Sequence, residues 1–405
     1  MRFSRLLSLL PLEAAVVLPR DDAVTYDGYR VYRIQTNGDH DNVISKLSAL
    51  SYEQWNYRAA EHVDISLSKE DAEKFEALGL DYKVKRQNGA LPSDSWFNSY
   101  HSYADHIQYW RDLNAAFPSN SEWFVAGQSY EKRDIFGLKL FGNDTSSTKP
   151  AVVWHSTVHA REWITTMTVE YIAYNMIKGY QANETDFATI PNEYDVYILP
   201  VVNPDGFSFS QTNDRLWRKN RSPAPLLGGL KLCYGTDINR NWPYQWTGDP
   251  RGSSPNPCDQ TYRGRAAGDT PENKALVAQM TAVSAKQPLA QYLDFHSYGQ
   301  YILSPYGYTA NVPANSAAQV DLGSKAAAAI ASVYGTPFTV GLSGATLYPT
   351  AGSSADFATD IAGAEYAYAF ELRDKGENGF VLPPDQIRPV GEEMLEGVKV
   401  MFLQM

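Results

Sequence analysis

The sequence predicts an α/β protein with a small α+β unit followed by a larger domain, in which helices cover both faces of a mixed, largely parallel twisted sheet. Over residues 25–90 the apolar pattern follows the order β-α-β-β-α-β, which is typical of a ferredoxin-like unit. Over residues 96–405 helix-like segments alternate with short apolar runs, which is typical of strands covered by helices.

The composition is that of an ordinary soluble protein, with 43% hydrophobic and 20% charged residues in a chain of 405. A net charge of −11 argues against a nucleic-acid partner, because such binding neutralises phosphates with Lys and Arg. No run is long and apolar enough to span a bilayer. We therefore expect a protein that binds neither nucleic acid nor membrane, and we also expect a monomer.

The N-terminus resembles a secretory signal peptide. Residues 1–5 are basic, residues 6–12 form a short apolar run, and Ala14 and Ala15 are small. We assign residues 1–16 as this signal and expect a secreted, extracellular protein. In a secreted chain the three Asn-x-Ser/Thr sequons would accept glycans; they lie at Asn143, Asn183 and Asn220.

The small unit is predicted from alternation and capping residues. We expect a first helix over residues 42–50, capped by Asp41 or Asn42, and a second helix that opens at Ser68. The expected strands cover residues 29–35, 55–58, 63–67 and 81–85. Lys85-Arg86 then leads into a polar linker, where an activating protease could cut; the alternative is an exposed charged turn.

The larger domain is predicted from ten segments. Helices are expected over 103–117, 163–181, 270–286, 316–334 and 392–403, and strands over 135–141, 150–154, 194–202, 292–295 and 367–372. Ligands of open α/β sheets bind outside the carboxyl ends of strands. Polar side chains at or just past such ends are His159, Asn203, His296 and Glu371.

A metal site is suggested by His159 and Glu162, three residues apart where a buried strand gives way to a helix. Zinc accepts imidazole nitrogen and carboxylate oxygen, and catalytic zinc sites keep three protein ligands. His296 is the candidate third ligand, and His155 competes with it. The alternatives are a surface or N-cap pair without metal and a buried, hydrogen-bonded His296.

Two charged islands, residues 214–219 and 237–242, carry arginines. Arg can hold a carboxylate through two parallel hydrogen bonds, and a second Arg can stabilise an oxyanion; the alternative is surface ion pairs. Asp237 could accept the second N–H of a ligand His and fix its tautomer.

Glu371 ends an apolar run that reads as a buried strand. A buried carboxylate is costly unless it is used or paired, so we expect it either to act as a general base or to pair with Arg373. A Ser-His-Asp triad is a poor alternative, because the chain has no Gly-x-Ser-x-Gly elbow.

Cys233 and Cys258 are the two cysteines, 25 residues apart. A bridge between them would stabilise the fold by roughly 3 kcal/mol and would need an oxidising compartment. The alternative is two free thiols.

Six motifs in this order closely resemble the zinc metallocarboxypeptidases of the pancreatic A/B type, the M14 family. The resemblance runs from about Trp96 to the C-terminus, and the segment before Lys85-Arg86 resembles the family's activation segment in pattern. The motifs are His159-Ala-Arg-Glu162-Trp, Asn203-Pro-Asp-Gly-Phe, Arg215-Leu-Trp-Arg218, Asp237-Ile-Asn239-Arg240, His296-Ser-Tyr298 and Phe370-Glu371-Leu-Arg.

The resemblance implies a zymogen with an activation domain over residues 25–90 and a catalytic domain over residues 96–405. One Zn²⁺ per chain would be held by His159, Glu162 and His296. Glu371 would be the base that activates water, and Arg218 would polarise the scissile carbonyl.

The resemblance also implies how a peptide substrate with a free C-terminus is held. Asn239 and Arg240 would bind the terminal carboxylate, and a mobile tyrosine, Tyr348, would close over it. Arg161 and Tyr298 match substrate-contact positions. Cys233 and Cys258 match a family disulfide.

Specificity follows from the residue seven positions after Tyr348, where family members that prefer Lys or Arg place an Asp. Here it is Ala355, which favours aliphatic or aromatic C-terminal residues, the A-type preference. The alternative is a B-type preference, because Asp356 is adjacent and the Tyr348–Glu371 spacing is one residue longer than usual. Members of both preferences, however, carry an Asp after the floor residue.

Two other functions share this fold. An inactive pseudopeptidase would lack a ligand or the base, and all are present here. A zinc deacylase would not need the Asn239-Arg240 pair or Tyr348. The first segment is either an inhibitory prosegment or a permanent binding domain.

Overall fold

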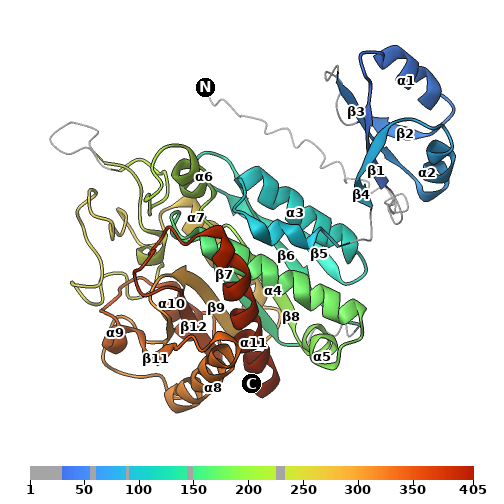
Figure 1. Ribbon diagram of the computed structural model, residues 1–405. Helices are drawn as coiled ribbons and strands as arrows, with labels where there is room; N and C mark the ends of the chain where they lie inside the picture. The colour runs from blue at the N-terminus through green and yellow to red at the C-terminus, as the bar shows by residue number, and fades with distance from the viewer. Residues whose placement is uncertain (1–29, 55–60, 88–90, 144–148, 225–232) are drawn as a thin grey trace, which may run out of the picture. The chain divides into compact units, whose positions relative to one another are not determined.

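The computed structural model describes residues 30–54, 61–87, 91–143, 149–224 and 233–405 (Figure 1). The predicted signal peptide, residues 1–16, lies outside them. The chain divides into two compact units, residues 1–88 and 89–405. No helix of the described residues is long and apolar enough to cross a membrane.

The smaller unit is a four-stranded sheet of order β2-β3-β1-β4 in which every neighbouring pair is antiparallel. Its apolar core includes Tyr32, Ile65 and Phe75. This is the expected ferredoxin-like order. The elements are β1 Arg30–Gln35, α1 His40–Leu47, β2 Tyr52–Gln54, β3 His62–Leu67, α2 Lys69–Glu76 and β4 Tyr82–Gln87.

Three details of this unit differ from the prediction or go untested. Asp39 caps α1 by accepting from Asn42 N at 3.2 Å, so the expected cap at Asp41 or Asn42 was wrong. The predicted strand at 55–58 lies outside the described residues, and β2 ends before it. Lys85-Arg86 belongs to the edge strand β4, where β1 still supplies backbone partners, and not to a linker.

In the larger unit the described residues form one mixed sheet of order β11-β10-β12-β9-β7-β8-β6-β5. The four central strands, β12, β9, β7 and β8, run parallel, so their carboxyl ends meet at one edge. The strands are β5 Ser121–Gln128, β6 Asp134–Leu140, β7 Ala151–Ser156, β8 Asp195–Leu199, β9 Leu289–Ser297, β10 Tyr301–Ser304, β11 Thr339–Leu342 and β12 Tyr366–Leu372.

Helices cover both faces of this sheet, as predicted. The helices α3, α4, α8 and α11 pack on one face, where α4 and α11 lie in front of the strands in Figure 1; α7 and α10 pack on the other. The α-helices are α3 Tyr103–Ala116, α4 Trp163–Gln181, α5 Thr185–Glu193, α6 Pro204–Thr212, α7 Pro271–Ser284, α8 Ser316–Tyr334, α9 Ser343–Thr346, α10 Ser354–Asp360 and α11 Ile387–Gln404.

The sheet separates two apolar cores because strand side chains alternate between its faces. On β7, Val152 and Trp154 join the core under α4 and α11, whereas Val153 points to the core under α7. The strand is buried along its whole length, which explains its continuous apolar sequence.

Candidate active site

One loop and one strand deliver the predicted metal ligands to the carboxyl edge of the sheet. The loop after β7 carries His159 and reaches α4, whose N-cap residue is Glu162. The third ligand, His296, lies near the end of β9, directly beside Glu371 of β12 in the parallel register. The edge of the parallel strands thus brings together residues more than two hundred positions apart.

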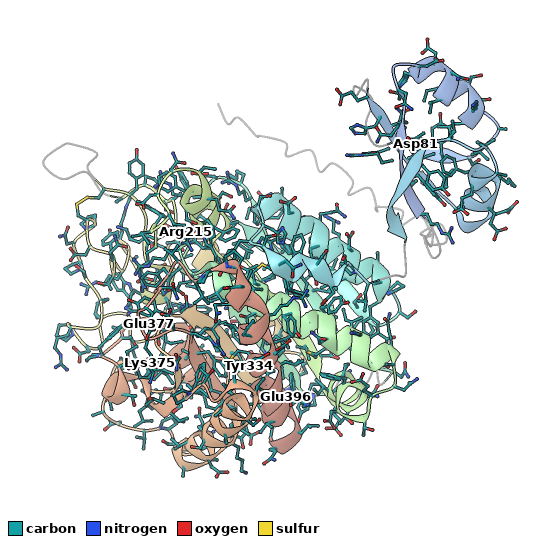
Figure 2. All side chains as sticks on the ribbon, viewed as in Figure 1. Asp81, Arg215, Tyr334, Lys375, Glu377 and Glu396 are labelled. Atoms are coloured by element: carbon teal, nitrogen blue, oxygen red, sulfur yellow. A yellow bond between two sulfur atoms is a disulfide. The ribbon has the colours of Figure 1, made fainter. Side chains whose placement is uncertain are left out.

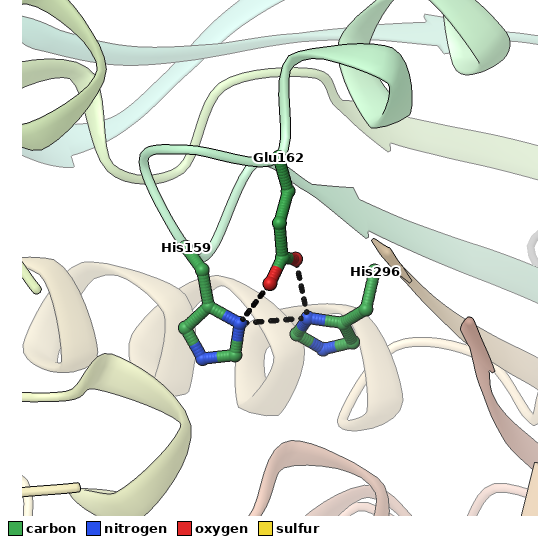
Figure 3. A group of neighbouring side chains, drawn as sticks. All are labelled: His159, Glu162 and His296. Carbon is green, nitrogen blue, oxygen red and sulfur yellow. Dashed lines mark hydrogen bonds and ion pairs between the residues drawn. The ribbon is translucent and has the colours of Figure 1, made fainter. Parts of the chain in front are cut away.

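The ligand atoms converge on one point (Figure 3). Nδ1 of His159 is 2.9 Å from Glu162 Oε1 and 3.1 Å from Nδ1 of His296, which is 3.1 Å from Glu162 Oε2. All three residues are buried, and their ligand atoms lie within 4.8 Å of one another. Two imidazole nitrogens and a carboxylate turned inward are a donor set that suits zinc.

The N-cap alternative for Glu162 is disfavoured by its side chain. Glu162 occupies the N-cap position of α4, yet it makes no side-chain capping bond. Burial alone would raise the pKa of this carboxyl, but the imidazoles of His159 and His296 outweigh burial and hold the pKa well below its usual range. The carboxylate therefore stays ionised and faces the two histidines.

Each histidine of the predicted metal site has a carboxylate beside its Nε2, the ring nitrogen that faces away from the other predicted ligands. His159 Nε2 lies 3.2 Å from Asp237 Oδ1, the partner that the sequence suggested, and His296 Nε2 lies 3.1 Å from Asp294 Oδ2. A carboxylate that accepts Nε2–H leaves the Nδ1 lone pair available to a metal. Asp294 was not predicted, although its position two residues before His296 on one strand face was a usable signal.

His155, the competing ligand, points elsewhere. Its Nδ1 is 3.0 Å from the hydroxyl of Tyr292, and its ring stacks near Trp242. Burial lowers its pKa to about 4, so the ring is neutral at pH 7. It lies outside the cluster of metal-binding groups.

Arg218 is a buried cation held in place by Asp237. Its Nε and Nη2 donate to Asp237 Oδ2 at 3.0 and 2.8 Å. Burial opposes its charge, but the carboxylates of Asp237 and Glu162 outweigh burial and raise its pKa. The surface ion pair considered for this residue is therefore wrong. Asp237 connects this guanidinium to the ligand His159.

Arg215, labelled in Figure 2, has a different role from Arg218. Its two terminal nitrogens donate to the carbonyl oxygens of Arg161 and Phe380, and its guanidinium lies 3.7 Å from the ring centre of Trp163. These contacts tie three loops together around the cleft. Burial lowers its pKa to about 10.

Asn239 and Arg240 lie in a short 3-10 helix, Ile238–Arg240, which Asp237 caps. Arg240 is 2% exposed, and its Nη1 donates to the Asn239 carbonyl at 2.7 Å. In the part of the chain that the structure describes, its Nε has no hydrogen-bond partner and no carboxylate forms a salt bridge with it. A buried guanidinium with a donor to spare is suited to binding an incoming carboxylate.

Glu371 is half-buried and lines the same cleft. Burial raises its pKa to about 8; a proton on His296 would oppose this shift, and the ionised Glu162 adds to it. A dication held by the three ligands would favour the ionised form instead. The expected alternative, pairing with Arg373, is wrong, because Arg373 is engaged by Glu393 of α11.

The predicted site residues surround one cavity of about 280 Å³. Tyr348 is 47% exposed at its rim, whereas Ala355, in the first turn of α10, is buried in its wall. Arg161 lies 3.9 Å over the ring of Phe380. The predicted residues that line the cavity are His159, Arg161, Glu162, Arg218, Asn239, Arg240, His296, Tyr298, Tyr348, Ala355 and Glu371.

Asp356 also lines the cavity, but its carboxylate accepts hydrogen bonds from the backbone. Its Oδ1 and Oδ2 accept from Gly307 N at 3.0 and 3.2 Å. Burial raises its pKa to about 6, although the Gly307 bond opposes the shift. The position of Asp356 next to Ala355 was evident from the sequence, but its hydrogen bond with Gly307 was not.

Cys233 and Cys258 form a disulfide with a Cα–Cα distance of 5.1 Å. The free-thiol alternative is therefore wrong. The bridge closes the loop that contains the Asn239-Arg240 segment.

Comparison with known proteins agrees with this site. The zinc carboxypeptidase family matches residues 106–397. Metallocarboxypeptidase A of Trichophyton rubrum is 40% identical over 427 aligned residues, which cover 98% of this chain and 97% of that protein.

Two solved structures share the fold. The carboxypeptidase A of Helicoverpa armigera is 29% identical with a TM-score of 0.69, over 93% of this chain and 97% of that one. Thrombin activatable fibrinolysis inhibitor is 26% identical with a TM-score of 0.71, over 93% and 98%. The chain belongs to the zinc carboxypeptidase family and is a metallocarboxypeptidase.

Proposed function

We propose that this protein is a secreted carboxypeptidase that removes single hydrophobic or aromatic residues from the C-termini of peptides and proteins. One observation carries the proposal. A single cavity joins a three-ligand metal set, a buried Arg with an unused donor, and an apolar wall at Ala355. This combination suits a substrate that ends in a carboxylate beside an apolar side chain.

Substrate binding begins with the terminal carboxylate. Arg240 donates to it through its guanidinium, and the amide Nδ2 of Asn239 adds a second donor. Charge-assisted bonds of this kind are short and strong, so they select a free chain end over an internal peptide. Tyr348, exposed at the rim, closes over the bound residue, and Arg161 and Tyr298 contact the residues before it.

The chemical step uses two further side chains. Zinc bound by the three ligands supplies Lewis-acid chemistry, because it lowers the pKa of water and polarises a carbonyl. Glu371 takes a proton from the attacking water and returns it to the departing amine. Arg218, fixed by Asp237, donates to the carbonyl oxygen as negative charge develops there.

The A-type preference rests on the cavity wall. Leu303, Leu347, Ala355 and Ala369 are apolar wall residues, and they leave room for a large side chain. Asp356 is adjacent to Ala355, but its carboxylate accepts from the backbone N–H of Gly307. These features favour Phe or Leu over Lys at the substrate C-terminus.

The substrate preference is tested with three peptides that differ only in the last residue, Phe, Leu or Lys. The proposal expects kcat/KM for the Phe and Leu peptides to exceed that for the Lys peptide. Faster release of Lys would establish the B-type preference instead. A deacylase would prefer a blocked N-acyl substrate without a free peptide C-terminus, and a pseudopeptidase would release nothing.

We also propose that the smaller unit is an inhibitory prosegment released near Lys85-Arg86. The dibasic pair lies on β4, an edge strand of the described four-stranded sheet, so within this sheet its backbone has a partner strand on one side only. Secretion is supported by the disulfide, because such bonds persist in oxidising compartments. Limited proteolysis should raise activity on a Phe-terminated peptide, and an equally active full-length chain would refute the inhibitory role.

A further inference from the structure

A buried group of polar side chains lies behind the ligand His296. Asp294 is on the same strand, β9, two residues earlier, and its Oδ2 lies 3.1 Å from His296 Nε2. Ser354, the first residue of α10, donates its hydroxyl to the same oxygen at 2.5 Å. Asp294 is fully buried, and among the described residues its Oδ1 has no hydrogen-bond partner, so both contacts act on Oδ2.

A second partner competes for the same histidine nitrogen. Asn239 Nδ2 lies 3.2 Å from His296 Nε2. The orientation of this amide is fixed, because Asn239 Oδ1 accepts from the backbone N–H of Ser354 at 2.8 Å. The group that faces His296 is therefore the NH₂ group, which is a donor only.

The two partners require opposite tautomers of a neutral His296. Donation from Asn239 needs a lone pair on Nε2, which moves the proton to Nδ1. Donation to Asp294 needs the proton on Nε2, which leaves the lone pair on Nδ1. Because Nδ1 is the atom that faces His159 and Glu162, only the second arrangement can bind a metal there.

We propose that Asp294, held by Ser354, is a positioning residue that places the proton of His296 on Nε2 and so makes Nδ1 a zinc ligand. The same arrangement leaves the Nδ2–H donors of Asn239 without an acceptor on the histidine and free for the substrate carboxylate. Ser354 orients both residues: its hydroxyl donates to Asp294 and its backbone N–H donates to Asn239. This inference rests on the proposed zinc site.

The test measures zinc affinity on the full chain by competition with a chelator of known affinity. In Asp294→Asn the shape is kept, but the new amide can donate to Nε2 and favour the wrong tautomer. Loss of an outer carboxylate partner typically weakens metal binding by roughly 10- to 100-fold, and we expect a change of that size. Cobalt substitution adds a second readout, because an altered ligand field shifts the visible spectrum.

The matched control is Gln291→Leu, on the same strand. Gln291 is fully buried, and its amide atoms have no partners among the described residues, so its replacement perturbs the core without touching His296. Zinc affinity should stay within about threefold of the wild type. Circular dichroism checks that both variants are folded.

If Asp294→Asn does not fold, the zinc affinity of Ser354 variants provides the test. Ser354→Ala removes the hydroxyl but keeps the backbone N–H, and zinc affinity should fall several-fold; Ser354→Thr should restore it. If the wild type binds zinc, and a folded Asp294→Asn or Ser354→Ala binds it with the same affinity, this inference is overturned. The proposed zinc site is then unaffected. A wild type that binds no zinc overturns the proposed metal site and this inference with it.

Discussion

Replacing His155 with Asn should make the folded protein more resistant to acid. The imidazole is fully buried beside Tyr292 and Trp242, and its pKa is lowered to about 4 by burial. In the unfolded chain the pKa is about 6.5. Asn retains a polar group where Nδ1 meets the Tyr292 hydroxyl but cannot be protonated.

The size of the effect follows from these two values. Above pH 6.5 both forms of the chain hold a neutral imidazole, and the residue has no effect on the pH dependence. As the pH falls from 6.5 toward 4, the unfolded chain binds a proton that the folded chain does not, and folding stability is lost. A gap of about 2.5 pH units corresponds to a loss of about 3 kcal/mol by pH 4.

The assay is urea unfolding of the zinc-free protein between pH 7.5 and 4. Relative to the wild type, His155→Asn should gain about 3 kcal/mol between pH 7 and pH 4, whatever it loses in packing at pH 7. His155→Gln should behave alike, which separates the charge effect from shape. Parallel stability curves for wild type and variants would show that protonation of His155 does not destabilise the folded protein.

Three further outcomes are expected. Cys258→Ser should lower the free energy of unfolding by roughly 3 kcal/mol, since it opens a loop of about 25 residues; equal urea midpoints would contradict this. In a secreting host Asn183→Gln should reduce glycan mass, because Asn183 is exposed. Asn220→Gln should leave the glycan mass unchanged, because Asn220 is buried and donates to Glu272. Loss of glycan mass in Asn220→Gln would contradict this expectation. Arg240→Gln should raise KM for a Phe-terminated peptide by roughly 30- to 150-fold, the equivalent of 2–3 kcal/mol of charge-assisted hydrogen bonding; an unchanged KM would remove Arg240 from carboxylate binding.

The long, strongly patterned elements could be predicted from sequence. The structure has α4 and α8 at their predicted bounds, because both are long and rich in apolar residues. The strands β10 and β11 were missed because four residues carry too little periodicity. The edge strand β5 was missed because most of its side chains are at least partly exposed, so it lacks an apolar run.

Helix ends were less predictable than helix interiors. The start of α11 was placed at residue 392, but the helix begins at Ile387 and contains Pro389 in its first turn. Proline is tolerated in a first helical turn, where its missing N–H costs no bond.

Contacts between site residues close in sequence could be predicted, whereas contacts between residues from distant elements could not. The proximity of His159 and Glu162 could be predicted because they are three residues apart in the sequence. The partner of Arg373 could not, because Glu393 comes from a distant helix. The link from Ser354 to Asp294 likewise depends on how α10 packs against β9, which no spacing encodes.

We propose that Glu371 acts as the base beside a metal held by His159, Glu162 and His296. The decisive measurement compares zinc content and hydrolysis of a Phe-terminated peptide for Glu371→Gln and for the wild type. We predict one zinc per chain in both proteins and a loss of at least about 100-fold in kcat for the variant. A variant that keeps zinc and hydrolyses the peptide at the wild-type rate would show that Glu371 is not the base.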